Sequence, residues 1–134
     1  MLDTFLEKFK IGEAVSPEQY SPLTLAYIGD CVYELFVRTY LIKDTRLPIK
    51  QLHRAATTYV NAKAQSDLYQ KISDRLTEEE SAIYKRGRNT YSRPPKNAVL
   101  RDYKSATGIE ALIGWLYLRG DSERICELLS ELIS

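Results

Sequence analysis

The chain of 134 residues has few cysteines and histidines and a small net charge. It contains two cysteines and one histidine, in no zinc-ligand spacing, which argues against a structural zinc site. The N-terminus has mixed charge and no signal-peptide pattern, so we expect a reduced, cytoplasmic protein, although a disulfide between Cys31 and Cys126 stays open. The formal net charge is only +1, which excludes a strong overall electrostatic field.

The longest hydrophobic run, residues 22–42, is interrupted by charged side chains. As a helix of about 30 Å it is long enough to cross a bilayer. However, Asp30, Glu34 and Arg38 would each cost roughly 2.5–3.5 kcal/mol near the bilayer centre. The run therefore predicts a core helix, and we expect no membrane partner.

Helix signals cover the chain, and no alternating strand pattern or internal repeat appears. Ser21-Pro22 is a typical helix start, Thr77 and Glu80 have capping-box spacing, and Gly120 is a typical helix stop. The segment 89–97 contains Pro94-Pro95, which predicts a loop. The chain is therefore predicted to be all-α with a single domain. The expected helices are residues 22–42, 48–72, 78–89, 102–119 and a last one after Asp121.

Two acids lie in stretches that are otherwise almost wholly apolar, Asp30 in LTLAYIGDCVYELFVRTYL and Glu110 in TGIEALIGWLYL. Removing an ionised carboxylate from water costs several kcal/mol unless a cation or hydrogen-bond donors compensate it. Neither acid has a Lys or Arg three or four residues away on its helix. We therefore expect both side chains to be buried in one shared site. The simpler alternatives are that Asp30 bonds a helix end or a distant Arg, and that Glu110 reaches solvent.

A shared site of this kind suits a metal ion. Carboxylate oxygens without His or Cys are the ligands of Mg²⁺, for which Mn²⁺ can substitute. A divalent ion held by Asp30 and Glu110 would polarise a phosphoryl oxygen and activate water for in-line attack. The sequence thus predicts catalytic and metal-binding roles for these two residues.

A basic segment runs from Lys85 to Lys104, with seven Lys or Arg residues and one acid, Asp102. Most charge runs are solvated loops, but the interleaved Asn, Ser and Tyr side chains here are common phosphate contacts. The segment also leads directly into the stretch that carries Glu110. The residues we predict to bind nucleic acid are Lys85, Arg86, Arg88, Asn89, Arg93 and Lys96.

At LAYIGDCVYELFV the chain resembles the signature helix of the ribonuclease III family, and more closely the small bacterial branch called Mini-ribonuclease III. Three further stretches agree in order and spacing: LHRAATTYVNAKAQ, KRGRN and YKSATGIEALIGWLYL. The resemblance implies an all-helical catalytic domain over residues 1–134, with no appended double-stranded-RNA-binding domain. It also implies a two-fold homodimer in which Tyr27 packs across the subunit interface.

The same resemblance implies a Mg²⁺-dependent endoribonuclease that cleaves double-stranded RNA, leaves 5′-phosphates and matures precursor 23S ribosomal RNA. No DNA partner is expected. Larger members of the family carry two further acids, where this chain has Ala26 and Thr107, and the small branch lacks them. Water or RNA phosphate oxygens would then complete the coordination of the ion. Two alternatives stay open: a non-catalytic RNA-binding or ribosome-associated module on the same fold, and a helical protein-interaction domain.

Overall fold

The computed structural model describes residues 2–9 and 15–133. Regular structure in these two segments is helical, without a strand, so the predicted all-α class is confirmed. Among the described residues, no helix is both long enough and apolar enough to span a bilayer. The α-helices are α1 (Leu2–Lys8), α2 (Pro22–Asp44), α3 (Ile49–Thr57), α4 (Ala62–Ile72), α5 (Glu78–Asn89), α6 (Leu100–Leu118) and α7 (Ser122–Leu129), and the short 3-10 helices are η1 (Pro17–Gln19), η2 (Ser73–Arg75) and η3 (Ser130–Leu132).

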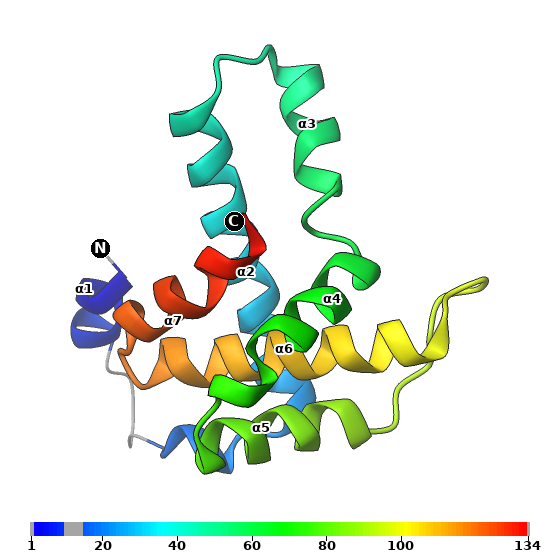
Figure 1. Ribbon diagram of the computed structural model, residues 1–134. Coiled ribbons are helices and arrows are strands. Elements are labelled where there is room, and N and C mark those ends of the chain that lie inside the picture. Colours follow the sequence, from blue (N-terminus) through cyan, green and yellow to red (C-terminus); the bar gives the residue numbers. More distant parts are fainter. Residues whose placement is uncertain (1, 10–14, 134) are drawn as a thin grey trace.

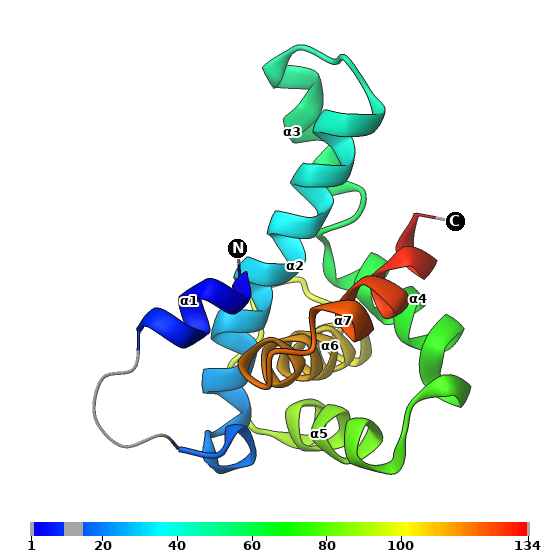
Figure 2. The same ribbon diagram turned by 90° about the vertical axis from the view of Figure 1, so that its left-hand side faces the viewer.

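Helix α6 is the centre of the molecule. It is apolar almost all round, so it must be covered on nearly every side. Helices α2, α4, α5 and α7 all contact it, and Figure 2, which looks along α6, shows them arranged around it. Ile109 and Trp115 have no solvent exposure. The hydrophobic core is therefore the surface of one helix together with the faces that other helices turn toward it.

Two glycines bring α2 and α6 into backbone contact where they cross. A Cβ atom at Gly29 would lie 1.8 Å from the backbone oxygen of Glu110. A Cβ at Gly114 would lie 2.0 Å from the backbone oxygen of Leu25. Neither position can hold a side chain at such distances, because protein interiors are close-packed and the obstructing atoms are backbone. The crossing is therefore fixed by one glycine on each helix.

The single helix predicted for residues 48–72 is wrong, because the chain breaks there into α3 and α4. The Thr58 hydroxyl donates back to a carbonyl of α3, and the Asn61 side chain caps α4 by accepting a backbone N–H at 2.8 Å. The Tyr33 hydroxyl donates to the carbonyl of Tyr59 at 2.5 Å and ties the break to α2. Side-chain bonds to the backbone thus replace the helical ladder. The end of α2 and α3 form a hairpin that projects from the body (Figure 1).

Most other predicted helix ends are confirmed. Ser21 accepts a hydrogen bond from the Thr24 backbone at 3.1 Å, and Thr77 and Glu80 form the expected capping box. Gly120 follows α6 with a φ of 78°, which a residue with a Cβ rarely adopts. These helix ends could therefore be predicted from local sequence alone.

Glu80 does more than cap α5. Its carboxylate is 4% exposed and accepts two bonds from Arg124, at 2.8 and 2.9 Å. Arg124 also donates to the Arg75 carbonyl at 2.8 Å. Burial alone would raise the pKa of Glu80, but the bonds from Arg124 and Thr77 outweigh it and hold the pKa below its usual value. One buried acid thus joins α5, α7 and the segment after α4.

Candidate active site

Asp30 and Glu110 come together where α2 crosses α6. Gly29 rests on the backbone of Glu110 itself, so the next residue of α2 projects at the edge of the crossing. The carboxyl groups of Asp30 and Glu110 are close enough to share a hydrogen bond. Two acids that lie far apart in the sequence therefore form one cluster beside the close backbone contact at Gly29.

The expectation that both acids are buried is half wrong. Glu110 is only partly buried, and Asp30 is exposed. Gly29, and not Asp30, faces α6, and the outer face of α2 is uncovered within the described chain. Apolar neighbours that made Asp30 look buried lie on that same face, with Tyr27 80% and Leu35 42% exposed. An apolar sequence context therefore did not mean burial at this position.

The surroundings of Glu110 favour its protonated form. Burial, followed by the hydrogen bond and the negative charge of Asp30, raises the pKa of Glu110 to about 8. Gln65 on α4 opposes it, because its Nε2 donates to Glu110 Oε2 at 3.5 Å. Two carboxyl groups this close repel one another when both are ionised, unless a proton or a cation lies between them.

The donor atoms of the cluster fit a hard divalent cation. They are carboxylate oxygens, and neither acid forms an ion pair with a Lys or Arg of residues 2–9 or 15–133. Within the same residues no three His, Cys, Asp or Glu side chains gather closely enough to hold a metal. The pair therefore leaves most coordination positions to water and substrate oxygens, which Mg²⁺ accepts readily.

The raised pKa of Glu110 predicts how pH affects the stability of the cation-free protein. The pKa of an unfolded glutamate is about 4.3, whereas the pKa of Glu110 in the fold is about 8. Between these values the folded chain binds the proton more tightly, so the free energy of unfolding falls as pH rises through this window. In chelator, we expect the native protein to lose more thermal stability from pH 5 to pH 8 than Glu110→Gln does. Equal losses in thermal unfolding scans of the two proteins would contradict this assignment.

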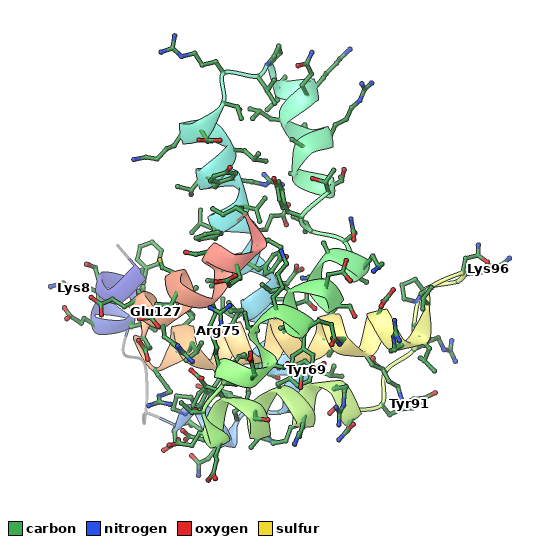
Figure 3. The ribbon with its side chains drawn as sticks, viewed as in Figure 1. Lys8, Tyr69, Arg75, Tyr91, Lys96 and Glu127 are labelled. Atoms are coloured by element: carbon green, nitrogen blue, oxygen red, sulfur yellow. The ribbon has the colours of Figure 1, made fainter. Side chains whose placement is uncertain are left out.

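The residues predicted to bind nucleic acid lie at the end of α5 and in the loop 90–99. Lys85, Asn89, Arg93 and Lys96 are exposed. Figure 3 shows Lys96 at the tip of the loop, pointing away from the body. These four side chains are available to a ligand, as the charge pattern of the sequence suggested.

Arg88 and Arg86 are more constrained. The Arg88 guanidinium lies over the ring of Tyr84, 5.8 Å from its centroid, and donates to the Asn89 side chain. Arg86 donates to the backbone carbonyls of Glu18 and Tyr20 at 3.2 and 3.3 Å, and so holds η1 against α5. Replacing Arg86 would therefore disturb structure as well as any contact with a ligand.

A cavity of about 370 Å³ lies between the loop 90–99 and α6. Asn89 and Tyr91 line it on the loop side, and Tyr103 and Thr107 line it on α6. Thr107 precedes Glu110 by less than one turn of the helix. Neither Asp30 nor Glu110 lines this cavity, so it belongs to the basic loop and not to the acid cluster.

Two buried polar residues, one on α4 and one on α6, were missed by sequence reasoning. Gln65 occupies the buried face of α4 together with Leu68 and Ile72, and a polar residue at that spacing was a visible signal. Asp102 is buried in the first turn of α6, and within the described chain its Oδ1 has no hydrogen-bond partner. Nothing in the local sequence distinguished Asp102 from an ordinary helix-start acid.

The matched region of a known family spans this site. The model of the Ribonuclease III domain matches residues 23–121, which include α2 through α6 and both acids of the cluster. This chain belongs to the ribonuclease III family. The stretches that carried the resemblance in the sequence are therefore parts of one continuous family match.

Relatives place the chain in the Mini-ribonuclease III branch of the ribonuclease III family. It is 43% identical to the Mini-ribonuclease 3 of Clostridium tetani, covering 96% of this chain and 89% of the relative. It is 46% identical to that of Enterococcus faecalis, covering 84% and 88%. A crystal structure of a protein from Fusobacterium nucleatum matches with a TM-score of 0.82 and 36% identity, over 90% of this chain and 98% of that one.

Proposed function

We propose that this protein is a divalent-cation-dependent endoribonuclease that cleaves double-stranded RNA, with Mg²⁺ as the natural ion and Mn²⁺ as a substitute. The observation that carries the proposal is the convergence of Asp30 and Glu110 at one edge of the α2–α6 crossing. Asp30 is exposed, so a polymer can reach the pair without a conformational change. The membership of the ribonuclease III family supports RNA, and not DNA, as the substrate.

Each acid would have its own part in the reaction. A bound divalent cation supplies Lewis-acid polarisation of the scissile phosphate and activates water. Asp30 and Glu110 would hold that cation, Asp30 from an exposed position and Glu110 from a partly buried one. Glu110 would release its proton when the cation binds, because a nearby positive charge favours the ionised carboxylate and opposes the burial and the Asp30 interactions that raise its pKa. Glu110 would thus exchange its proton for a metal ion.

We propose that the outer face of α2 forms a two-fold homodimer. Exposed apolar side chains follow this face at helical spacing, namely Leu23, Tyr27, Leu35 and Ile42. Such a stripe on an otherwise well-packed helix favours contact with a second copy. Because Asp30 lies beside Tyr27 on α2, a two-fold contact there would present one acid pair to each strand of a duplex.

Two basic surfaces are suited to holding the RNA backbone. The loop surface comprises Lys85, Arg88, Arg93 and Lys96. The hairpin surface comprises Lys43, Arg46, Lys50 and Arg54, which are exposed at the projecting end of α2 and along α3 (Figure 1). Among the described residues, no acid forms an ion pair with any of these eight side chains. A-form RNA is recognised largely through phosphates and 2′-hydroxyls, for which such side chains are apt.

Neutralising one basic residue of the loop surface should weaken binding in a salt-dependent way. We expect Lys96→Ala to reduce the slope of log K against log salt for an RNA duplex by about one, because one phosphate contact is lost. Lys8→Ala is the matched control, since Lys8 is also exposed and lies on the opposite side of the molecule (Figure 3). Fluorescence anisotropy over a salt series measures both slopes, and equal slopes would remove Lys96 from the RNA surface. The same series on Lys50→Ala tests the hairpin surface.

The reaction itself is tested on a duplex from precursor 23S ribosomal RNA, the substrate that we propose for a cytoplasmic enzyme of this branch. We expect staggered cuts with 5′-phosphate ends in Mg²⁺ and none in chelator, read on a sequencing gel. Tight, salt-sensitive binding without any Mg²⁺-dependent product would instead establish the non-catalytic RNA-binding module.

A further inference from the structure

Gln65 is the polar side chain that supports Glu110 from a third helix. It is 3% exposed and lies on the face of α4 that packs against α6. Its Nε2 donates to Glu110 Oε2 at 3.5 Å, which is the long limit of a hydrogen bond. Bonds to an ionised carboxylate are shorter and stronger than bonds to a neutral acid. The contact therefore holds one carboxylate oxygen of Glu110 from the α4 side and leaves the other oxygen free to face a ligand.

A neutral amide is the side chain that this position requires if Glu110 binds a cation. A Lys or Arg at position 65 would pair with Glu110 and compete directly with the metal ion. An apolar residue would leave this carboxylate oxygen without its donor from α4. The amide of Gln65 stabilises the ionised form of Glu110 and adds no positive charge.

We propose that Gln65 is a positioning residue that orients Glu110 for the divalent cation. This role rests on the proposed function, because it presupposes a cation at Asp30 and Glu110. In a site with only two acids, each carboxylate contributes a large share of the binding, so its orientation matters more than in a site with four. Outer groups that orient a metal ligand commonly contribute 10–100-fold, as a rough range, to metal affinity.

The experiment compares Gln65→Leu with Gln70→Leu, a matched control on an exposed position of the same helix. Isothermal titration of the RNA-free protein with Mn²⁺ and with Mg²⁺ gives the affinity directly. We expect Gln65→Leu to bind either ion about 10–100-fold more weakly, and Gln70→Leu to bind as the native chain does. Cleavage by Gln65→Leu should recover when Mg²⁺ is raised, because the defect lies in cation affinity.

A second substitution separates positioning from packing. Gln65→Glu should bind the cation more tightly than Gln65→Leu does, because it places a further carboxylate beside the acid pair. A packing role alone predicts the reverse order, since leucine suits a buried position better than glutamate does. Gln65→Met, which is close in length, replaces Gln65→Leu if that variant does not fold by circular dichroism.

The outcomes keep the two proposals apart. If the native chain binds cation and cleaves RNA, but a folded Gln65→Leu binds cation equally well, the role of Gln65 is overturned and the proposed function stands. If the native chain binds no divalent cation and cleaves no RNA, the proposed function fails and the role of Gln65 fails with it.

Discussion

Replacing Asp30 with Asn is expected to abolish RNA cleavage and to leave the fold intact. The Asp30 side chain is exposed, so the substitution removes a charge without opening a cavity in the core. Lewis-acid stabilisation by a metal ion is worth several kcal/mol in a transition state. Losing one of two protein ligands should therefore reduce the rate roughly 10³-fold or more. Single-turnover cleavage of a labelled duplex with saturating enzyme measures this loss independently of binding.

Asp44→Asn is the matched control, because Asp44 is an exposed acid on the same helix and lies three to four turns from Asp30. It should cleave at the native rate. Duplex affinity in chelator should not fall in Asp30→Asn, since removing a negative charge from an RNA-binding edge cannot weaken attraction to phosphate. A folded Asp30→Asn protein that cleaves as fast as the Asp44→Asn protein would remove Asp30 from the reaction.

The fold was largely predictable because its helix ends depend on local chemistry. Ser21, Thr77 and Gly120 each act within one turn of their own position, and each was legible without knowledge of tertiary contacts. The break between α3 and α4 was not. Part of the break is local, because Asn61 caps α4. The other part is a hydrogen bond from Tyr33, a residue of another helix, to the Tyr59 carbonyl, and local spacing does not predict that contact.

The sequence predicted that the two acids of the candidate site lie together, but it did not predict their exposure or the residue that contacts them from α4. Asp30 and Glu110 stood out because charges are costly in apolar stretches, and the structure places them together. The burial predicted for Asp30 was wrong because the outer face of α2 is apolar without being covered in the described chain. Gln65 was missed because the search followed charged residues, although its spacing with Leu68 and Ile72 places this uncharged amide on the buried face of α4. Contacts between helices that are far apart in the sequence could not be predicted from local patterns.

The close approach of α2 and α6 leads to a second large expected effect. Replacing a helical glycine with alanine normally stabilises a protein by up to about 1 kcal/mol. At Gly29 we expect the opposite sign, because the new Cβ would lie 1.8 Å from the backbone oxygen of Glu110. Overpacking usually costs about 1–3 kcal/mol, and here neither neighbouring backbone can rotate away. Urea denaturation followed by circular dichroism should show Gly29→Ala to be less stable by about 3 kcal/mol or more.

Gly114→Ala separates the two consequences of this crossing. Its Cβ would meet the Leu25 backbone at 2.0 Å, so it should destabilise the fold to a similar degree. Gly29 is adjacent to Asp30, however, and its contact is with Glu110 itself, so Gly29→Ala also moves the two carboxyl groups apart. At a temperature where both variants remain folded, Gly29→Ala should lose far more cleavage activity than Gly114→Ala. A stable and fully active Gly29→Ala protein would show that the α2–α6 contact does not set the geometry of the acid pair.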